Sequence, residues 1–105
     1  MHEAALELEG AIELRRRAPA SPAVIDRCAQ AVVLALRALL ADRGSVLWAD
    51  AEPAALPALL GEAGLRPPSE AMRLIDPEAV DIDSDEALNS AHAALAWSSG
   101  SLTAA

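Results

Sequence analysis

The sequence predicts an all-α protein, a small up-and-down helix bundle of four main helices plus a short helical segment, in a single domain over residues 1–105. Its 26 alanines and 16 leucines are strong helix formers, while strands favour β-branched and aromatic residues, and tyrosine and phenylalanine are absent. The length suits one hydrophobic core. Because so many apolar residues are alanine, the helices are expected to approach one another closely.

The first helix is predicted over Glu3–Arg17, where Ala5, Leu8 and Ile12 recur on one stripe. Three consecutive arginines occupy its last turn, at the negative end of the helix dipole. These arginines are therefore interpreted as a charge cap rather than as a phosphate-binding patch.

The second, central helix is predicted over Val24–Leu40. Ser21 and Pro22 precede it, because serine accepts hydrogen bonds from the free amides of the first turn and proline loses no needed bond there. Gly44 is expected to end it. The positions with the spacing of a buried face are Ile25, Cys28, Val32, Ala35, Leu36 and Leu39.

The middle of the chain is predicted to hold two shorter helical segments. Residues 45–52 are expected to form a loop whose Trp48 closes one end of the core, although a short extended segment is an alternative. A third helix is predicted from Pro53 to about Gly61. After two consecutive prolines, Ser69 is expected to cap a brief segment that stops before Pro77.

The last helix is predicted to begin at a capping box formed by Asp83 and Glu86. Its buried stripe is expected to contain Leu88, Ala91, His92 and Leu95. Residues 98–105, which are rich in serine, are expected to be frayed.

Acidic residues at alternate positions, Asp81, Asp83 and Asp85, resemble the start of a calcium-binding loop. The pattern then departs from that loop, because the sixth position should be glycine and is Glu86, and the twelfth should be glutamate and is His92. The cluster is therefore interpreted as an acid-rich helix cap. We expect no metal site and no bound cofactor.

Composition excludes several classes of function. The net charge is −8 and all eight basic residues are arginine, so a nucleic-acid partner is not expected. The chain has no lysine for a Schiff base and no glycine-rich phosphate loop, and Cys28 has the surroundings of a small core residue rather than of a nucleophile. No signal peptide or membrane-spanning segment is recognised, which predicts a cytoplasmic protein.

The order of these elements resembles that of the HEPN superfamily of small helical bundles, over about residues 24–97. The likeness is carried by the central helix Arg27–Leu40, the short element Ala55–Leu60, the loop Asp76–Asp85 and a last helix that begins Asp85-Glu86-Ala87-Leu88. The resemblance implies a bundle that often dimerises and often accompanies a minimal nucleotidyltransferase.

Ribonuclease members of that superfamily carry an arginine four to six residues before a histidine near the start of the last helix. Before His92, the matching positions of this chain are Asp85, Glu86 and Ala87, and none is arginine. The resemblance therefore implies a non-catalytic binding or pairing module rather than a nuclease.

The resulting hypothesis is a non-enzymatic helical module that acts through protein–protein association, as a homodimer or bound to another protein. Leu95, Trp97 and Trp48 are the predicted interface residues, since tryptophan is frequent among interface hot spots. Trp97 has a second interpretation, in which it folds over the end of the bundle.

Two alternatives remain open from the sequence. One is an atypical HEPN-like nucleotide-binding protein, or a ribonuclease or toxin–antitoxin component, that uses His92; the simpler interpretation of His92 is a partly buried, hydrogen-bonded side chain. The other is a small-ligand bundle with a pocket between the second and last helices. Its predicted lining residues are Val32, Leu36, Leu88 and Leu95.

Overall fold

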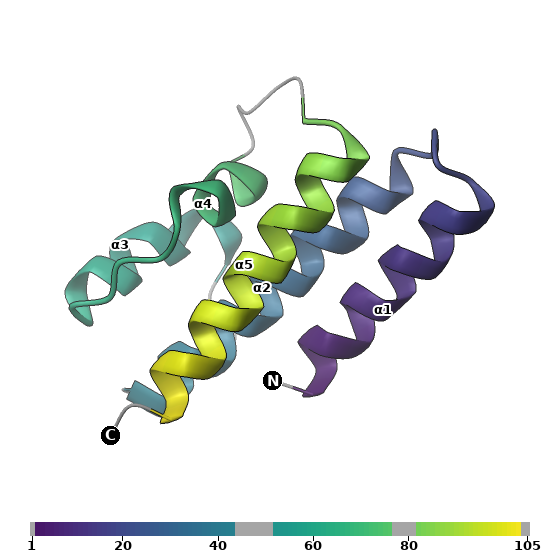
Figure 1. Cartoon of the computed structure of the whole chain (residues 1–105). Coiled ribbons are helices and arrows are strands. Elements are labelled where there is room, and N and C mark those ends of the chain that lie inside the picture. The colour runs from purple at the N-terminus through teal and green to yellow at the C-terminus, as the bar shows by residue number, and fades with distance from the viewer. Residues whose placement is uncertain (1, 44–51, 77–81, 104–105) are drawn as a thin grey trace.

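The computed structural model describes residues 2–43, 52–76 and 82–103, and within these ranges it contains helices and no strand. This confirms the predicted all-α class. In chain order the elements are α1 (His2–Arg17), α2 (Ala23–Arg43), the 3-10 turn η2 (Pro53–Ala55), α3 (Leu56–Glu62), α4 (Ser69–Ile75) and α5 (Ser84–Thr103) (Figure 1).

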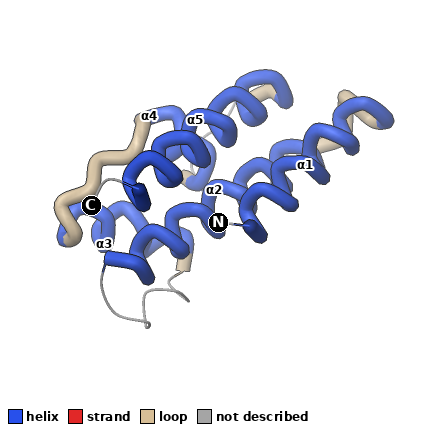
Figure 2. Tube along the Cα trace, turned by 60° about the horizontal axis from the view of Figure 1, so that its bottom comes forward, coloured by secondary structure: helices blue, strands red, loops and turns tan. Residues whose placement is uncertain are grey.

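The three long helices, α1, α2 and α5, pack side by side. α1 and α2 are antiparallel, whereas α5 runs in the same direction as α2, and α3 and α4 lie on the side of α2 opposite to α1 (Figures 1 and 2). Contacts agree with this topology, because the first residue of α5, Ser84, donates a hydrogen bond to the carbonyl of Pro19 between α1 and α2 (3.4 Å). This is the orientation that an up-and-down order gives to its second and fourth main helices, and the two short helices occupy the return path between them.

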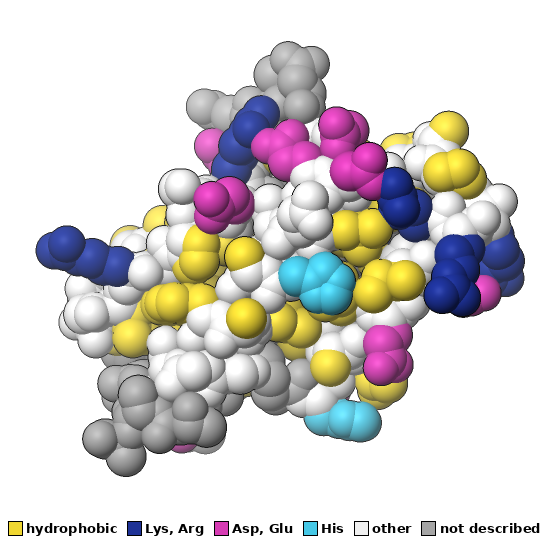
Figure 3. All heavy atoms as spheres, viewed as in Figure 1, with side chains coloured by type: hydrophobic (Ala, Val, Ile, Leu, Met, Phe, Trp, Pro, Cys, Tyr) yellow, Lys and Arg dark blue, Asp and Glu magenta, His cyan; other side chains and the backbone are white. Residues whose placement is uncertain are grey.

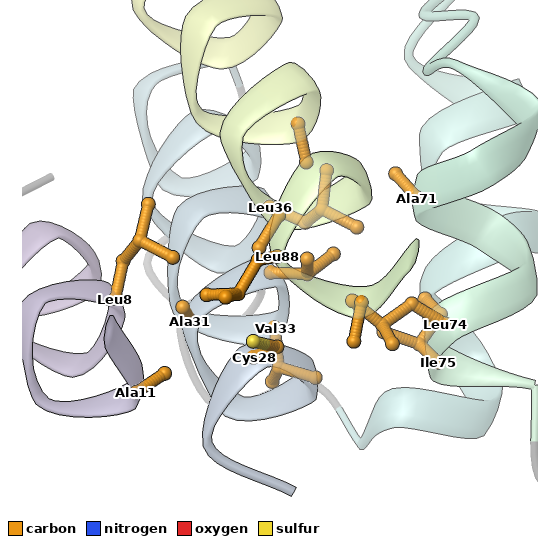
Figure 4. Packing of buried hydrophobic residues seen from close by; sticks show 14 of the residues in the cluster. Leu8, Ala11, Cys28, Ala31, Val33, Leu36, Ala71, Leu74, Ile75 and Leu88 are labelled. Carbon is orange, nitrogen blue, oxygen red and sulfur yellow. The ribbon is translucent and has the colours of Figure 1, made fainter. Parts of the chain in front are cut away.

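α2 forms the centre of the bundle and packs against each of the other four α-helices. Side chains of α2 line up toward α1 on one side and toward α5 and α4 on the other (Figure 4). The fully buried apolar residues of α2 are Val24, Cys28, Ala31, Val32, Ala35, Leu36, Leu39 and Leu40. This helix therefore contributes more of the core than any other element, as the sequence predicted.

Small side chains form the contact between α1 and α2. α1 buries Ala4, Leu8 and Ala11, and Figure 4 shows Leu8 and Ala11 pointing toward Ala31 of α2. The predicted stripe on α1 is rotated by one position, since Ala5 is exposed. The narrower alanine face lets the two helix axes come closer than leucine on both sides would allow.

Gly10 is part of the same close approach. A Cβ atom added at Gly10 would lie 2.2 Å from a guanidinium nitrogen of Arg27, so the arginine side chain crosses α1 at the glycine. Glycine is unfavourable inside a helix, and at Gly10 the missing side chain leaves room for the end of the Arg27 side chain.

Two of the predicted side-chain caps are present and one is wrong. Ser21 Oγ accepts a hydrogen bond from the amide of Ala23 (3.3 Å), and a carboxylate oxygen of Asp83 accepts one from the amide of Glu86 (2.7 Å). Ser69, in contrast, is the first residue of α4 rather than its cap, and the helix has no side-chain cap hydrogen bond.

α3 ends in a left-handed turn at Gly64, whose φ is 75°. The amide of Leu65 donates to the carbonyl of Leu60 (2.9 Å), and the amide of Gly64 donates to that of Gly61 (3.1 Å). This pair of bonds is the Schellman arrangement, in which glycine avoids the strain of a positive φ. Gly64 is therefore the residue at which the chain leaves α3.

The end of α5 differs from the sequence prediction. The helix continues to Thr103 instead of fraying from residue 98, and Ser98 is completely buried. A short serine side chain fits where α5 meets its neighbours, so a serine-rich sequence here is helical and packed rather than loose. Ser98 Oγ has no hydrogen-bond partner.

The lone hydroxyl of Ser98 predicts a stabilising substitution. Ser98→Ala removes an unpaired buried polar atom and improves helix propensity, so we expect the free energy of unfolding to rise by about 1 kcal/mol or more. Urea denaturation measures the change. Ser69→Ala, at an exposed helical serine without a cap bond, is the matched control and should change stability by less than about 0.5 kcal/mol. A loss of stability in Ser98→Ala would show that the hydroxyl is satisfied.

Candidate functional site

His92 is exposed on α5, which corrects the prediction of a partly buried histidine. It follows Asp85 by seven residues, about two helical turns, so both lie along the exposed edge of α5. Leu88 and Ala91 of the predicted stripe are buried, whereas Leu95 is only partly so. Within the described residues, His92 makes no hydrogen bond or ion pair that would orient its ring.

Leu95 and Trp97 lie on opposite flanks of α5. Leu95 follows Ser84, and Trp97 follows Glu86, by eleven residues, which is about three turns and therefore the same flank in each case. Ser84 faces the α1–α2 connection, whereas Glu86 pairs with Arg73 of α4. The two predicted interface residues therefore do not form one continuous patch.

Both side chains are partly buried and pack against the core cluster. Each therefore closes an edge of the core and still keeps part of its surface accessible. Partial burial of Trp97 is compatible with both interpretations: the side chain covers the core, and its accessible part could contact another protein. Trp48, the third predicted interface residue, lies outside the described residues.

Polar contacts gather at the beginning of α5. Arg15 of α1 pairs with Asp85, and Arg73 of α4 pairs with Glu86. Figure 3 shows carboxylates gathered over this end of the helix with basic side chains on both sides. These contacts join α5 to its neighbours on two sides. Ion pairs as exposed as these stabilise a fold by at most about 1 kcal/mol each. They therefore orient α5 against its neighbours but contribute little to the stability of the bundle.

An acidic hollow of about 470 Å³ lies beside this cluster. Its lining residues are Glu70, Asp83, Asp85, Glu86, Asn89, Ser90 and Ala93. Asp83 is engaged in capping α5 and Asp85 in the pair with Arg15. No group of three potential ligands among the described residues is arranged to hold a metal ion, and Asp81 of the calcium-like pattern lies outside them.

Cys28 is completely buried and unpaired, as predicted for a core residue. Burial raises the pKa of its thiol from 9.0 to about 11, because the thiolate would lose its hydration in the apolar interior. A nucleophilic cysteine requires the opposite shift. The position of Cys28 therefore suits packing and disfavours covalent catalysis.

The ligand pocket considered between the second and last helices is filled by core. Val32, Leu36 and Leu88 belong to one cluster of buried residues, and Leu95 packs against it. These side chains contact one another instead of lining a space.

Two adjoining hollows lie where α2 meets α4 and η2, and the sequence did not predict them. Their volumes are about 250 and 460 Å³, and both are lined by Pro53 and Ile75. The available signal was Val33, an apolar residue that extends the apolar surface of α2 beyond its main buried face. Val33 alone could not predict a hollow, because the hollow also needs Leu74 and Ile75, which α4 places beside Val33.

No helix in the described parts of the chain combines the length and apolar composition that a membrane span requires. The sequence matches no protein-family model, and comparisons with curated proteins and with solved structures find no significant match.

The raised pKa of Cys28 predicts an alkaline loss of stability. The unfolded chain releases the thiol proton near pH 9, whereas the folded chain keeps it to about pH 11, so the free energy of unfolding should fall between these pH values. The fall is at most about 1.4 kcal/mol per pH unit. Urea denaturation at several pH values measures it.

The chain offers an unusually clear control for this experiment. It has no tyrosine, and all its basic residues apart from histidine are arginine, so no other side chain titrates between pH 9 and 11. Cys28→Ala should lower stability at every pH but remove the alkaline decline. An unchanged decline in Cys28→Ala would assign it to another process.

Proposed function

We propose that this chain is a non-catalytic helical module that acts in the cytoplasm by associating with another protein, either a second copy of itself or a different partner. The observation that carries the proposal is the incomplete burial of Leu95 and Trp97 at the two edges of the core. A tryptophan that keeps accessible surface beside a packed core can serve as the anchor of a protein contact.

The chemistry of the reactive side chains supports a role without catalysis. Cys28 is buried with a raised thiol pKa, and Asp85 and Glu86 are engaged in ion pairs with arginines. These groups serve the packing of the bundle. The same residues would need free, oriented functional atoms to act as nucleophile or general base.

Charge bears on which association is favoured. A net charge of −8 on a chain of 105 residues makes two copies repel each other, whereas a basic partner is attracted. A homodimer must therefore offset this repulsion by apolar contact. A heterologous partner gains from the same charge.

The HEPN-like alternative gains one favourable observation, the exposure of the His92 side chain. It also requires an arginine or an orienting acid beside the imidazole, and no contact within the described residues supplies one. The association hypothesis needs no such group, so it is the function that we propose.

Sedimentation equilibrium over a wide protein concentration range tests association. If the chain pairs with itself, Trp97→Ala should weaken the dimer at least about tenfold, because a tryptophan anchor typically contributes more than 1 kcal/mol. Leu6→Ala is the matched control, since Leu6 is a large apolar side chain on another helix, α1, and is 52% exposed. Thermal melting of each variant separates loss of association from loss of fold.

A heterologous partner would give a second outcome of the same measurement. The purified chain would then sediment as a monomer and form a defined complex with the protein that co-purifies with it, and Trp97→Ala or Leu95→Ala would weaken that complex. A stable monomer without any co-purifying protein, unaffected by either substitution, contradicts the proposal.

A further inference from the structure

Ser90 of α5 carries a buried hydroxyl that makes no hydrogen bond within the described part of the chain. The residue is only 5% exposed, and it lines the acidic hollow of about 470 Å³ beside α5. Among the described residues, the unpartnered polar atoms without any accessible surface are Arg15 Nε and Ser98 Oγ, so the Ser90 hydroxyl keeps access to the hollow. Buried polar groups are normally paired, and this one therefore indicates a partner that the described chain does not supply.

The ion pair between Arg73 and Glu86 brings a second polar group to the same place. Glu70 precedes Arg73 by three residues on α4, and Ser90 follows Glu86 by four residues on α5. Each therefore lies one helical turn from the pair, on the same flank of its own helix. Both line the hollow, so a carboxylate of one helix and a hydroxyl of another border one space.

The hollow keeps an excess of negative charge. Of its four carboxylates, those of Asp85 and Glu86 are each paired with an arginine. Glu70 and Asp83 have no cationic partner among the described residues, and Asp83 engages one oxygen with the amide of Glu86. A cation is therefore the kind of ligand that this hollow attracts.

We infer that this hollow binds the primary ammonium group of an alkylamine. The carboxylate of Glu70, the amide oxygen of Asn89 and the hydroxyl of Ser90 are hydrogen-bond acceptors, and an ammonium group has three donors and no acceptor. Ala93 provides an apolar contact for the alkyl chain, and the volume of the hollow is within the range of small-ligand sites. This binding activity goes beyond the proposed association and does not depend on it.

The other classes of ion suit the hollow less well. Anions are repelled by its carboxylates, and no group of three potential metal ligands is arranged among the described residues. A guanidinium group is planar and prefers the two coplanar oxygens of one free carboxylate. The acceptors here belong to three different side chains, and the freely rotating donors of an ammonium group fit them better.

The test titrates the full-length, ¹⁵N-labelled chain with diaminobutane. Amide chemical shifts should change mainly at residue 70 and at residues 86–93, and the affinity should fall as salt is added. Butanediol has the same carbon chain with hydroxyls in place of the ammonium groups, so it should not bind.

Variants of the hollow then locate the contact. Glu70→Gln removes the unpaired carboxylate and should weaken diaminobutane by about fivefold or more, and Ser90→Ala should weaken it by about threefold or more. Glu62→Gln, at an exposed glutamate of α3, is the matched control and should leave the affinity unchanged. Melting curves confirm that each variant is folded.

A lysine derivative with both backbone ends blocked identifies the source of the ammonium group. Tighter binding of this derivative than of diaminobutane assigns the site to a lysine side chain of another protein, and the reverse order assigns it to a free amine. Either order keeps the ammonium site.

Four outcomes would overturn the inference: no binding of diaminobutane, equal binding of butanediol, the same shift changes with magnesium chloride at equal ionic strength, or an affinity that Glu70→Gln does not lower. The proposed function is tested separately by sedimentation. Association that depends on Trp97, together with a hollow that diaminobutane leaves unperturbed, would keep the proposed function and remove this inference.

Discussion

The close approach of small side chains around α2 is the constraint on which the rest of the structure depends. α2 is in contact with every other α-helix, and the faces that meet it are rich in alanine, such as Ala4 and Ala11 of α1 and Ala91 and Ala94 of α5. An alanine contributes little apolar area, so these contacts stabilise the bundle through closely spaced backbones, while buried leucines such as Leu36, Leu39 and Leu60 contribute the large apolar side chains. Such a core tolerates little added volume. Leucines such as Leu36 and Leu60 are fully buried in it, whereas Leu95 and Trp97 remain at its edges.

The direction of α5 links this packing to the surfaces of the molecule. Because α5 runs parallel to α2, the chain must return through α3 and α4, and these short helices cover one side of α2 only as far as their length allows. The two adjoining hollows lined by Pro53 and Ile75 lie where this cover ends. The incomplete cover on this side of α2 is therefore a direct consequence of the topology.

Sequence patterns predicted the helices well and their surroundings less well. Composition, the serine and aspartate caps and the burial of Cys28 depend on neighbours a few residues away, so they were accessible from the sequence. The exposure of His92 differs from the prediction because the sequence shows an apolar stripe on α5 but not how far neighbouring α1 covers it. The burial of Ser98 depends on packing against other helices, so the serine-rich end of the sequence predicted fraying instead. The hollow between α2 and α4 combines Val33 with Leu74 and Ile75 from another helix, so no local sequence pattern could indicate it.

Urea denaturation of two leucine variants of α5 tests most directly whether closely packed alanines hold the bundle together. Ala94 of α5 is fully buried, whereas Ala96, two residues later, is exposed, and alanine and leucine have similar helix propensities. If close approach of alanine faces holds the bundle together, Ala94→Leu should lower the free energy of unfolding by about 1–3 kcal/mol, and Ala96→Leu should change it by less than about 0.5 kcal/mol. Equal effects of the two substitutions, or a gain in stability for Ala94→Leu, would contradict a closely packed alanine core.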